Sequence, residues 1–220
     1  MTERNDGVST VLIIGASRGI GLETLRCALK AGHKVRALAR SAGAIAVSHP
    51  DLEKIGGDAL DRGAVTQALA GVDAVIQTLG VVASPQMIFK PVRLFSEATH
   101  VLITAMEETG VKRLICLTGF GAGDSRNKGG FLYNTAFHLF LGRVYDDKDV
   151  QEQLIRKSKL DWVIARPGIL TNGPRTGSYR VLVDPKDWRC GFISRADVAD
   201  FLVKQIDNDE LLGKTPVLTS

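Results

Sequence analysis

The sequence has few cysteines and no long hydrophobic run. Its three cysteines, Cys27, Cys116 and Cys190, are widely spaced over 220 residues and form no C-x-x-C pair. An odd, scattered set predicts reduced thiols rather than a disulfide framework or a redox pair. No apolar run approaches the ~18 residues of a membrane span, and no basic start precedes an apolar leader segment. We therefore expect a cytoplasmic protein that is neither secreted nor inserted in a membrane.

Patterns typical of metal sites and of nucleic-acid binding are also missing. The four histidines are scattered without metal-ligand spacing, so we expect no metal site. The net charge of +4 is mild, and the basic residues do not form a stripe interleaved with aromatic side chains. These absences argue against a nucleic-acid partner and leave a small molecule as the expected one, while the oligomeric state stays open.

The composition itself is that of a globular domain, with 45% hydrophobic and 24% charged residues. Strand patterns and helix patterns alternate along most of the chain. The expected strands cover residues 10–14, 34–38, 52–55, 73–78, 113–117, 162–165 and 216–218. The expected helices cover residues 20–31, 61–70, 92–109, 146–158 and 196–206. Repeated βα units predict an α/β fold with a doubly wound parallel sheet that binds its ligand at the carboxyl ends of the strands.

The most specific motif is a glycine-rich segment between the first strand and the first helix. A buried strand that turns through glycines into a helix exposes the N–H groups of the helix N-terminus, which bind a pyrophosphate. The spacing is G-x-x-x-G-x-G, and its strand–turn–helix context predicts dinucleotide binding. The residues assigned to this role are Gly15, Ser17, Arg18, Gly19, Ile20 and Gly21.

The sequence also lacks an acidic residue between Glu23 and Asp51. An NAD-type site places a carboxylate at the end of the second strand to bind the ribose 2′-hydroxyl. Here Arg18 lies in the glycine-rich segment, and Arg40-Ser41 follows the second strand. Guanidinium groups bind a phosphate, which a carboxylate would repel. We therefore expect NADP(H) rather than NAD(H), with a solvated loop residue as the alternative role for Arg40.

Two further segments are expected to contact the cofactor. Asp58 and Ala59 follow the third strand, where Asp58 either accepts a hydrogen bond from the adenine amino group or caps the next helix. Thr78-Leu79-Gly80 ends the fourth strand, where glycine lets the backbone pass close to the adenosine or the ribose. Residues 10–220 are thus predicted to form one NAD(P)-binding Rossmann domain, after a flexible polar stretch at 1–9.

Several motifs occur together in a characteristic order. They are Gly15 to Gly21, Arg40, Gly57-Asp58-Ala59-Leu60-Asp61, Val111-Lys112-Arg113-Leu114-Ile115, Leu160-Asp161-Trp162-Val163-Ile164-Ala165-Arg166-Pro167-Gly168 and Ile193-Ser194-Arg195-Ala196-Asp197-Val198-Ala199. This set resembles the atypical short-chain dehydrogenase/reductase superfamily, in the compact branch of the flavin/biliverdin-IXβ reductases and the NmrA-like proteins. The resemblance implies a Rossmann sheet with the substrate above the nicotinamide. It further implies a substrate-side loop at 167–192, with Pro167 and Gly168 beside the cofactor.

The chain departs from that family at the catalytic residues. The family uses Ser or Thr after the fifth strand and Tyr-x-x-x-Lys on the next helix, and the second pattern is absent. Lys148 matches the family lysine, which bonds the nicotinamide ribose, but Val144 occupies the tyrosine position. Thr118 falls at or beside the serine position. Thr118, Lys148 and Tyr145 are the candidate catalytic residues; the alternatives are a strand-end threonine, a solvated lysine and an ordinary interfacial tyrosine.

Together these features predict an NADP(H)-dependent oxidoreductase that transfers hydride to a small planar or carbonyl substrate. For a conjugated ring such as a flavin, tetrapyrrole or quinone, solvent can supply the proton that the missing tyrosine does not. The alternative is a non-catalytic NADP(H)-binding redox sensor or scaffold; an epimerase is disfavoured because no well-placed acid/base pair is evident. Candidate apolar walls of the cleft are Phe120, Phe131, Phe137, Phe140 and Trp188, with core packing favoured for Phe137 and Phe140.

Overall fold

The structure, a computed structural model, describes residues 7–81, 92–126, 128 and 131–220, and for 131–141 the backbone alone. Its main sheet has eight strands in the order β3-β2-β1-β4-β5-β6-β10-β8. Neighbouring strands are parallel except for the antiparallel pair β10 and β8. The strands are β1 (Thr10–Ile14), β2 (Lys34–Ala39), β3 (Leu52–Gly56), β4 (Ala74–Gln77), β5 (Arg113–Leu117), β6 (Asp161–Pro167), β8 (Arg180–Leu182) and β10 (Val217–Thr219). The predicted α/β fold with a doubly wound sheet is confirmed.

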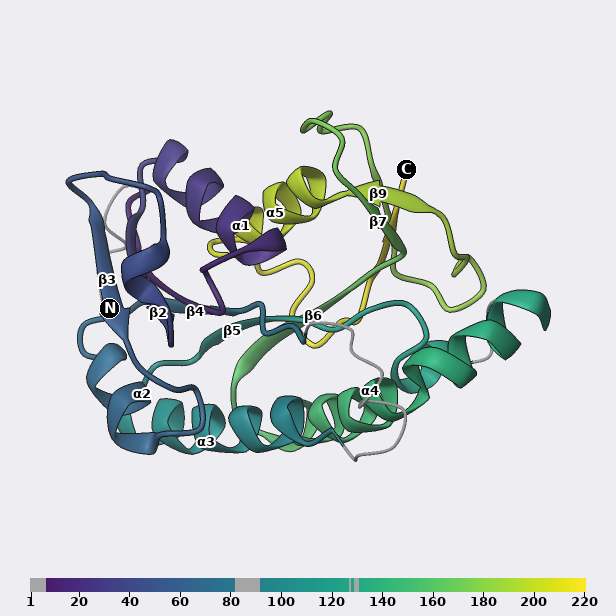
Figure 1. The fold of residues 1–220 in the computed structure, drawn as a ribbon, viewed down its shortest axis with the longest axis horizontal. Helices are drawn as coiled ribbons and strands as arrows, with labels where there is room; N and C mark the ends of the chain where they lie inside the picture. The colour runs from purple at the N-terminus through teal and green to yellow at the C-terminus, as the bar shows by residue number, and fades with distance from the viewer. Residues whose placement is uncertain (1–6, 82–91, 127, 129–130) are drawn as a thin grey trace.

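Helices cover both faces of this sheet (Figure 1). One face carries α1 (Gly19–Lys30) and α5 (Arg195–Lys204), and the other carries α2 (Arg62–Ala68), α3 (Leu94–Thr109) and α4 (Phe131–Lys157). Successive strand residues point to opposite faces, so Val11 and Ile13 pack in the core beneath α1 and α5, whereas Leu12 and Ile14 pack in the core against α2 and α3. Strands that are apolar at every position are therefore buried on both sides.

The structure differs from the sequence prediction in one helix and in the segment between β6 and α5. The helix predicted from Asp146 begins at Phe131, and Gly142 lies within it, where glycine weakens the helical signal. Residues 167–192, here called the β6–α5 segment, contain short strands in place of a purely irregular loop. Strands of three residues are too short to show a periodic pattern.

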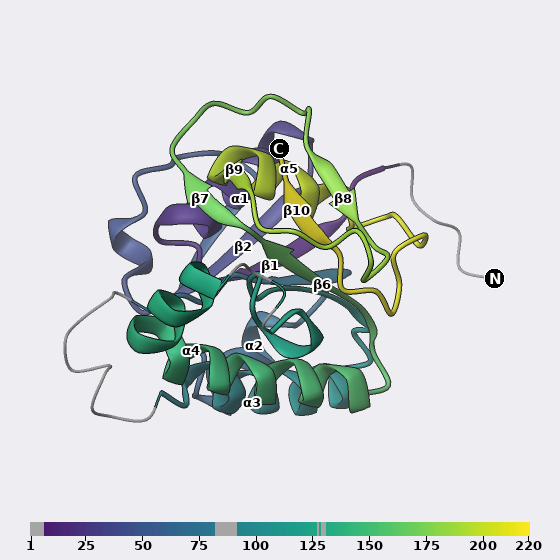
Figure 2. The ribbon, with the colours of Figure 1, turned by 90° about the vertical axis from the view of Figure 1, so that its right-hand side faces the viewer.

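A second, two-stranded parallel sheet joins the two ends of the β6–α5 segment. It pairs β7 (Ile169–Thr171) with β9 (Phe192–Ser194). In Figure 2 this small sheet lies on the same side of the main sheet as α1 and α5. Ile193 packs in the core of that side and Leu170 packs against it, so the small sheet extends the layer formed by the two helices.

Two aspartates of α5 hold the middle of the β6–α5 segment. The carboxylate of Asp197 accepts hydrogen bonds from the backbone N–H groups of Thr176 and Gly177, each at 2.8 Å. The carboxylate of Asp200 accepts a hydrogen bond from the hydroxyl of Tyr179 at 2.8 Å. The segment is thus held at its ends by the pairing of β7 with β9 and in its middle by hydrogen bonds to α5.

Two further predictions concern the N-terminal stretch and the absence of a membrane-spanning helix. Of the N-terminal stretch predicted to be flexible, residues 1–6 lie outside the described residues, while the backbone carbonyl of Ser9 accepts a hydrogen bond from the N–H of Lys34 at 3.1 Å. Among the helices that the structure describes, none combines the length and the apolar character needed to cross a membrane.

Candidate active site

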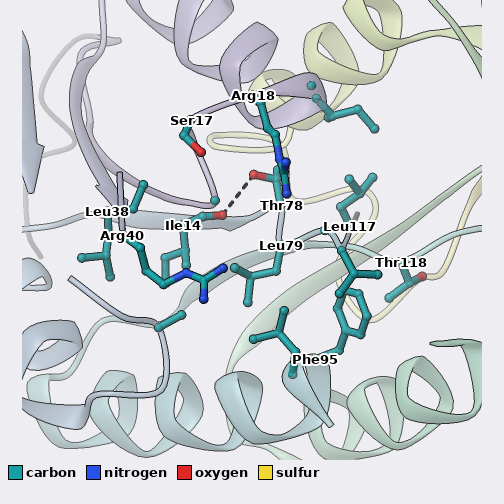
Figure 3. Close-up of a pocket in the computed structure, with 18 of the residues that line it drawn as sticks. Ile14, Ser17, Arg18, Leu38, Arg40, Thr78, Leu79, Phe95, Leu117 and Thr118 are labelled. Atoms are coloured by element: carbon teal, nitrogen blue, oxygen red, sulfur yellow. Dashed lines mark hydrogen bonds between the residues drawn. The ribbon is translucent and has the colours of Figure 1, made fainter. Parts of the chain in front are cut away.

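A cavity of about 860 Å³ opens at the carboxyl ends of the parallel strands β1, β2, β4 and β5, the edge where α/β sheets bind ligands. Its lining draws on the whole length of the chain, from the β1–α1 turn to the start of α5. The predicted site residues that it brings together are Gly15, Ser17, Arg18, Gly19, Ile20, Arg40, Ser41, Asp58, Ala59, Thr78, Leu79, Gly80, Thr118, Tyr145, Lys148 and Pro167. Figure 3 shows part of this lining.

The N-terminus of α1 opens into the cavity without a side-chain cap. Arg18 is the N-cap residue; its side chain makes no capping hydrogen bond, and the first turn contains no acidic residue. The first N–H groups of a helix have no partner within the helix, so they are available to an anion. A Cβ atom on Gly19 would meet nothing within 4 Å, which leaves open space beside these amides. The turn therefore fits a pyrophosphate.

Two other glycines of the motif serve packing. Gly15 has a φ of +91°, and a Cβ atom there would lie 2.9 Å from the carbonyl oxygen of Thr78. A Cβ atom on Gly21 would lie 2.1 Å from the carbonyl oxygen of Gly15 and 2.6 Å from Thr78 Oγ1, which itself donates to the carbonyl of Ile14 (Figure 3). Gly21 does not line the cavity, so its missing side chain lets α1 pack against β1 and β4 rather than admitting a phosphate.

Gly168, also assigned to the cofactor from the sequence, is likewise a packing residue. A Cβ atom there would lie 2.2 Å from the carbonyl oxygen of Gly191, just before β9. Gly168 is not part of the cavity lining, whereas its neighbour Pro167 is. The end of β6 therefore approaches the small sheet too closely for a side chain at this position.

Arg18 and Arg40 reach into the same cavity from different elements (Figure 3). Arg18 precedes α1, and Arg40 follows β2 at the position of the acidic residue in an NAD-type site. Among the residues that the structure describes, neither arginine has an acidic partner. By contrast, Arg36, which lies within β2, pairs with Glu53, with 2.7 Å between Nε and Oε2. The cavity thus receives two uncompensated positive charges at its β1–β2 end, which suits a phosphate.

The structure separates the two roles considered for Asp58. Asp61, not Asp58, caps α2, because its carboxylate accepts hydrogen bonds from the N–H groups of Gly63 and Ala64. Asp58 accepts the N–H of Leu60 at 3.0 Å, in the turn before that helix, and lines the cavity. Helix capping is therefore wrong for Asp58, and the contact with adenine stays a prediction.

Lys148 lies buried at the other end of the cavity. Its ammonium donates a hydrogen bond to the backbone carbonyl of Thr118 at 2.5 Å and lies 4.9 Å from the ring centroid of Phe95. Burial lowers the pKa of Lys148 from 10.5 to about 8, although the carboxylate of Glu152 acts in the opposite direction. The solvated role considered for Lys148 is wrong, because the side chain is only 8% exposed.

Tyr145 lines the cavity beside Lys148. Its hydroxyl lies against Gly119, where a Cβ atom would come within 2.5 Å of the phenolic oxygen. Burial raises the pKa of Tyr145 above its usual 10, so the hydroxyl keeps its proton. At neutral pH this end of the cavity therefore contains two hydrogen-bond donors, the ammonium of Lys148 and the hydroxyl of Tyr145.

The low pKa of Lys148 predicts a pH dependence of cofactor binding. Below about pH 8 the side chain is charged, and as the pH rises through this value it loses the charge that attracts an anionic nucleotide. We expect the dissociation constant for NADPH to rise above pH 8, approaching about tenfold per pH unit. Titrations between pH 6.5 and 9.5 measure this, and Lys148→Arg, which keeps its charge, should flatten the profile. A wild-type profile that is flat above pH 8 would contradict the prediction.

Sequence reasoning missed much of the apolar lining and one arginine. The additional lining residues are Ile14, Leu38, Ala39, Ala44, Gly57, Val81, Leu94, Phe95, Leu117, Val144, Leu170 and Arg195. Arg195, the first residue of α5, donates to the side-chain oxygen of Asn172 at 2.6 Å. Many of these residues follow or end a strand, so the strand order identifies the region; Gly57 and Arg195 lie in motifs recognised from the sequence, but those motifs did not assign them to the cavity.

Two of the aromatic residues predicted as walls of the cleft lie elsewhere. Phe120 and Trp188 pack together with Val217 in a separate buried cluster and do not line the cavity. The side chains predicted at 131, 137 and 140 lie outside the described residues. The aromatic ring in the cavity lining that no motif indicated is Phe95, near the start of α3.

Known proteins resemble this chain over nearly its full length. Residues 15–209 match the model of the NAD(P)H-binding family. The uncharacterized sugar epimerase YhfK of Bacillus subtilis is 28% identical, over 94% of this chain and 96% of that protein. The structure of ChuY, an anaerobillin reductase from Escherichia coli O157:H7, is 28% identical, with a TM-score of 0.77 over 96% of this chain and 97% of ChuY. A short-chain dehydrogenase/reductase of Veillonella parvula in complex with NADP shares the fold, at 17% identity and a TM-score of 0.79 over 96% of this chain and 94% of that one.

Proposed function

The chain belongs to the NAD(P)H-binding family, as its resemblance to the atypical short-chain dehydrogenase/reductases predicted, and we propose that it is an NADPH-dependent reductase of a small planar or carbonyl substrate. One observation supports the proposal: a single cavity contains, at one end, an uncapped helix N-terminus and two arginines that have no acidic partner in the described part of the chain, and, at the other end, buried hydrogen-bond donors. The likeness to ChuY, which is a reductase, supports it.

The cofactor half of the cavity divides into three contacts. The N–H groups at the start of α1, with Ser17, would hold the pyrophosphate. Arg18 and Arg40 would bind the 2′-phosphate, which is why NADP(H) is favoured over NAD(H). Asp58 would accept a hydrogen bond from the adenine, and Lys148 would contact the nicotinamide ribose. When bound, NADPH supplies a hydride.

The other half of the cavity suits acceptors that gain negative charge. The ammonium of Lys148 and the protonated hydroxyl of Tyr145 both line it, and such donors stabilise an oxyanion or a reduced ring as it forms. Apolar side chains, among them Phe95 and Leu170, complete the walls and offer a surface for a planar ring. A planar conjugated acceptor fits these features best, because the apolar walls can pack against its ring and the two donors can stabilise the charge of its reduced form.

The proposal is tested by following NADPH absorbance with purified protein and a panel of flavins, quinones, a linear tetrapyrrole and simple aldehydes. NADH serves as the comparator. We expect NADPH oxidation with at least one conjugated class and slower oxidation of NADH. Tight NADPH binding without turnover on the whole panel would argue against the reductase.

The second candidate is a non-catalytic NADP(H)-binding sensor or scaffold. The observation in its favour is Val144, which stands where the family has its catalytic tyrosine, although Val144 and the adjacent Tyr145 both line the cavity. The same panel distinguishes the two candidates, because a sensor binds NADPH but does not consume it.

Removal of the Tyr145 hydroxyl should lower kcat to different extents for the two substrate classes. For Tyr145→Phe we expect kcat to fall by about 100-fold with an aldehyde, which needs a proton donor, and by less than about threefold with a flavin or quinone. Steady-state kinetics with both classes measure this. Tyr179→Phe is the matched control, because the Tyr179 hydroxyl bonds Asp200 and does not line the cavity. Equal losses with both classes would contradict the expectation.

A further inference from the structure

A buried chain of hydrogen bonds behind the cavity fixes the hydroxyl of Thr118. This hydroxyl donates to Glu152 Oε1 at 2.8 Å. Glu152 also accepts two hydrogen bonds from Arg166, one from Nε to Oε1 at 2.9 Å and one from Nη2 to Oε2 at 2.5 Å. Glu152 and Arg166 are 1% and 0% exposed and lie outside the cavity lining, whereas Thr118 belongs to it.

Arg166 is itself held from several sides. Its Nη2 pairs with Asp124 at 2.5 Å, and its guanidinium lies 5.1 Å from the ring centroid of Trp188. Gly123 makes room for the ion pair, since a Cβ atom there would lie 2.4 Å from Glu152 Oε2 and 2.5 Å from Arg166 Nη2. The guanidinium therefore cannot move away from Glu152 without losing several contacts.

This arrangement decides the direction of the Thr118 hydrogen bond. A carboxylate accepts hydrogen bonds and has none to donate, so the shared hydrogen comes from Thr118. The backbone carbonyl of Thr118 is occupied by the ammonium of Lys148. What remains for the cavity is the lone-pair side of the Thr118 hydroxyl, which is an acceptor.

We propose that Thr118 presents a fixed hydrogen-bond acceptor to the cavity and thereby selects a ligand N–H group, with Glu152 and Arg166 as positioning residues. The group is either the carboxamide of the nicotinamide or a ring N–H of the acceptor substrate. A threonine with a free hydroxyl would instead donate to a substrate carbonyl, and Glu152 prevents this. The inference rests on the proposed function in taking the cavity as the site of cofactor and substrate.

The test compares ligands that differ only in the N–H group. The cofactor pair is NADP⁺ and its 3-acetylpyridine analogue, in which an acetyl group replaces the carboxamide. The substrate pair is lumiflavin and 3-methyllumiflavin, added to protein saturated with NADP⁺. Dissociation constants from calorimetry require no turnover, so a protein that fails to oxidise NADPH still tests the inference. The variants are Thr118→Val, which removes the hydroxyl, Thr118→Ser, which keeps it, and Glu152→Gln.

We expect Thr118→Val to weaken the N–H ligand of one pair by about three- to tenfold, and its N–H-free partner by less than about twofold. An effect on the first pair identifies the nicotinamide carboxamide, and an effect on the second identifies the substrate. The quantity compared is the ratio of two dissociation constants, that of the N–H-free ligand divided by that of the N–H ligand. Thr118→Ser should keep the wild-type ratio. Glu152→Gln should lower the ratio as Thr118→Val does, because an amide can donate to the hydroxyl and reverse its direction.

Three results would overturn the inference. Thr118→Val could weaken both members of a pair equally, as a general structural defect does, or change neither pair. Alternatively, a folded Glu152→Gln protein could keep the wild-type ratios, in which case Glu152 does not position the hydroxyl. If thermal unfolding shows that Glu152→Gln does not fold, the comparison of Thr118→Val with Thr118→Ser decides.

Discussion

Replacement of Arg40 by alanine should weaken NADPH binding by about 10- to 100-fold and NADH binding by less than about twofold. Arg40 lines the cavity directly after β2, and no carboxylate among the described residues neutralises it. Its guanidinium is therefore available to a 2′-phosphate, which NADH lacks. Fluorescence titration with both nucleotides measures the two dissociation constants, and their ratio is the decisive quantity.

A matched surface arginine provides the control for this experiment. Arg26 pairs with Glu23 on the exposed face of α1 at 2.9 Å and does not line the cavity. Arg26→Ala should leave both nucleotides unaffected. If Arg40→Ala weakens NADPH and NADH by the same factor, Arg40 does not bind the 2′-phosphate and the preference for NADP(H) loses its main support.

The largest effect on stability is expected from Gly21→Ala. Helix propensity alone predicts that alanine stabilises a helical position by about 1 kcal/mol. Here the new Cβ atom would lie 2.1 Å from the carbonyl oxygen of Gly15 and 2.6 Å from Thr78 Oγ1, so α1 must shift away from β1 and β4. We expect a net loss of about 3 kcal/mol in the free energy of unfolding, together with weaker binding of NADPH. Urea unfolding measures the first quantity.

Gly19→Ala is the matched control, two residues earlier in the same motif. Its Cβ atom would meet nothing within 4 Å, although Gly19 has a φ of +56°, so the cost is backbone strain of about 1 kcal/mol. Gly21→Ala should therefore be clearly the less stable of the two variants. If Gly19→Ala is the less stable one, the packing role assigned to Gly21 is wrong.

The sequence predicted the fold well because its signals are local. The buried strands β1, β4 and β5 are short runs of apolar residues, each followed along the chain by a helix, and this pattern can be recognised without knowing which strands pair. The glycine-rich segment and Arg40 could also be assigned from the neighbouring sequence alone, since each follows directly after a predicted strand. The strands β7, β8 and β9 were missed because each has only three residues, too few to show a periodic pattern.

The missed parts of the site depend on contacts between distant elements. The motif that contains Arg166 was recognised, but its ion pair with Glu152 joins β6 to α4 and is visible only once the two elements are packed together. The same holds for Gly21, whose function depends on Thr78 at the end of β4. A glycine in a phosphate-binding motif suggests contact with the ligand, and only the structure distinguishes that role from close packing.

The hydrogen bonds between α5 and the β6–α5 segment indicate which positions of the chain tolerate a different side chain. Asp197 binds the main-chain N–H groups of Thr176 and Gly177, and every residue except proline offers such a group. A substitution at Thr176 can therefore keep this main-chain hydrogen bond, whereas the hydrogen bond from Tyr179 to Asp200 depends on the side chain. Gly15 and Gly21 of the glycine-rich segment have no such tolerance, because packing leaves no room for a side chain at either position. A change of side chain at position 176 thus leaves the segment fastened to α5, while a side chain at Gly15 or Gly21 would disturb the turn at the start of α1.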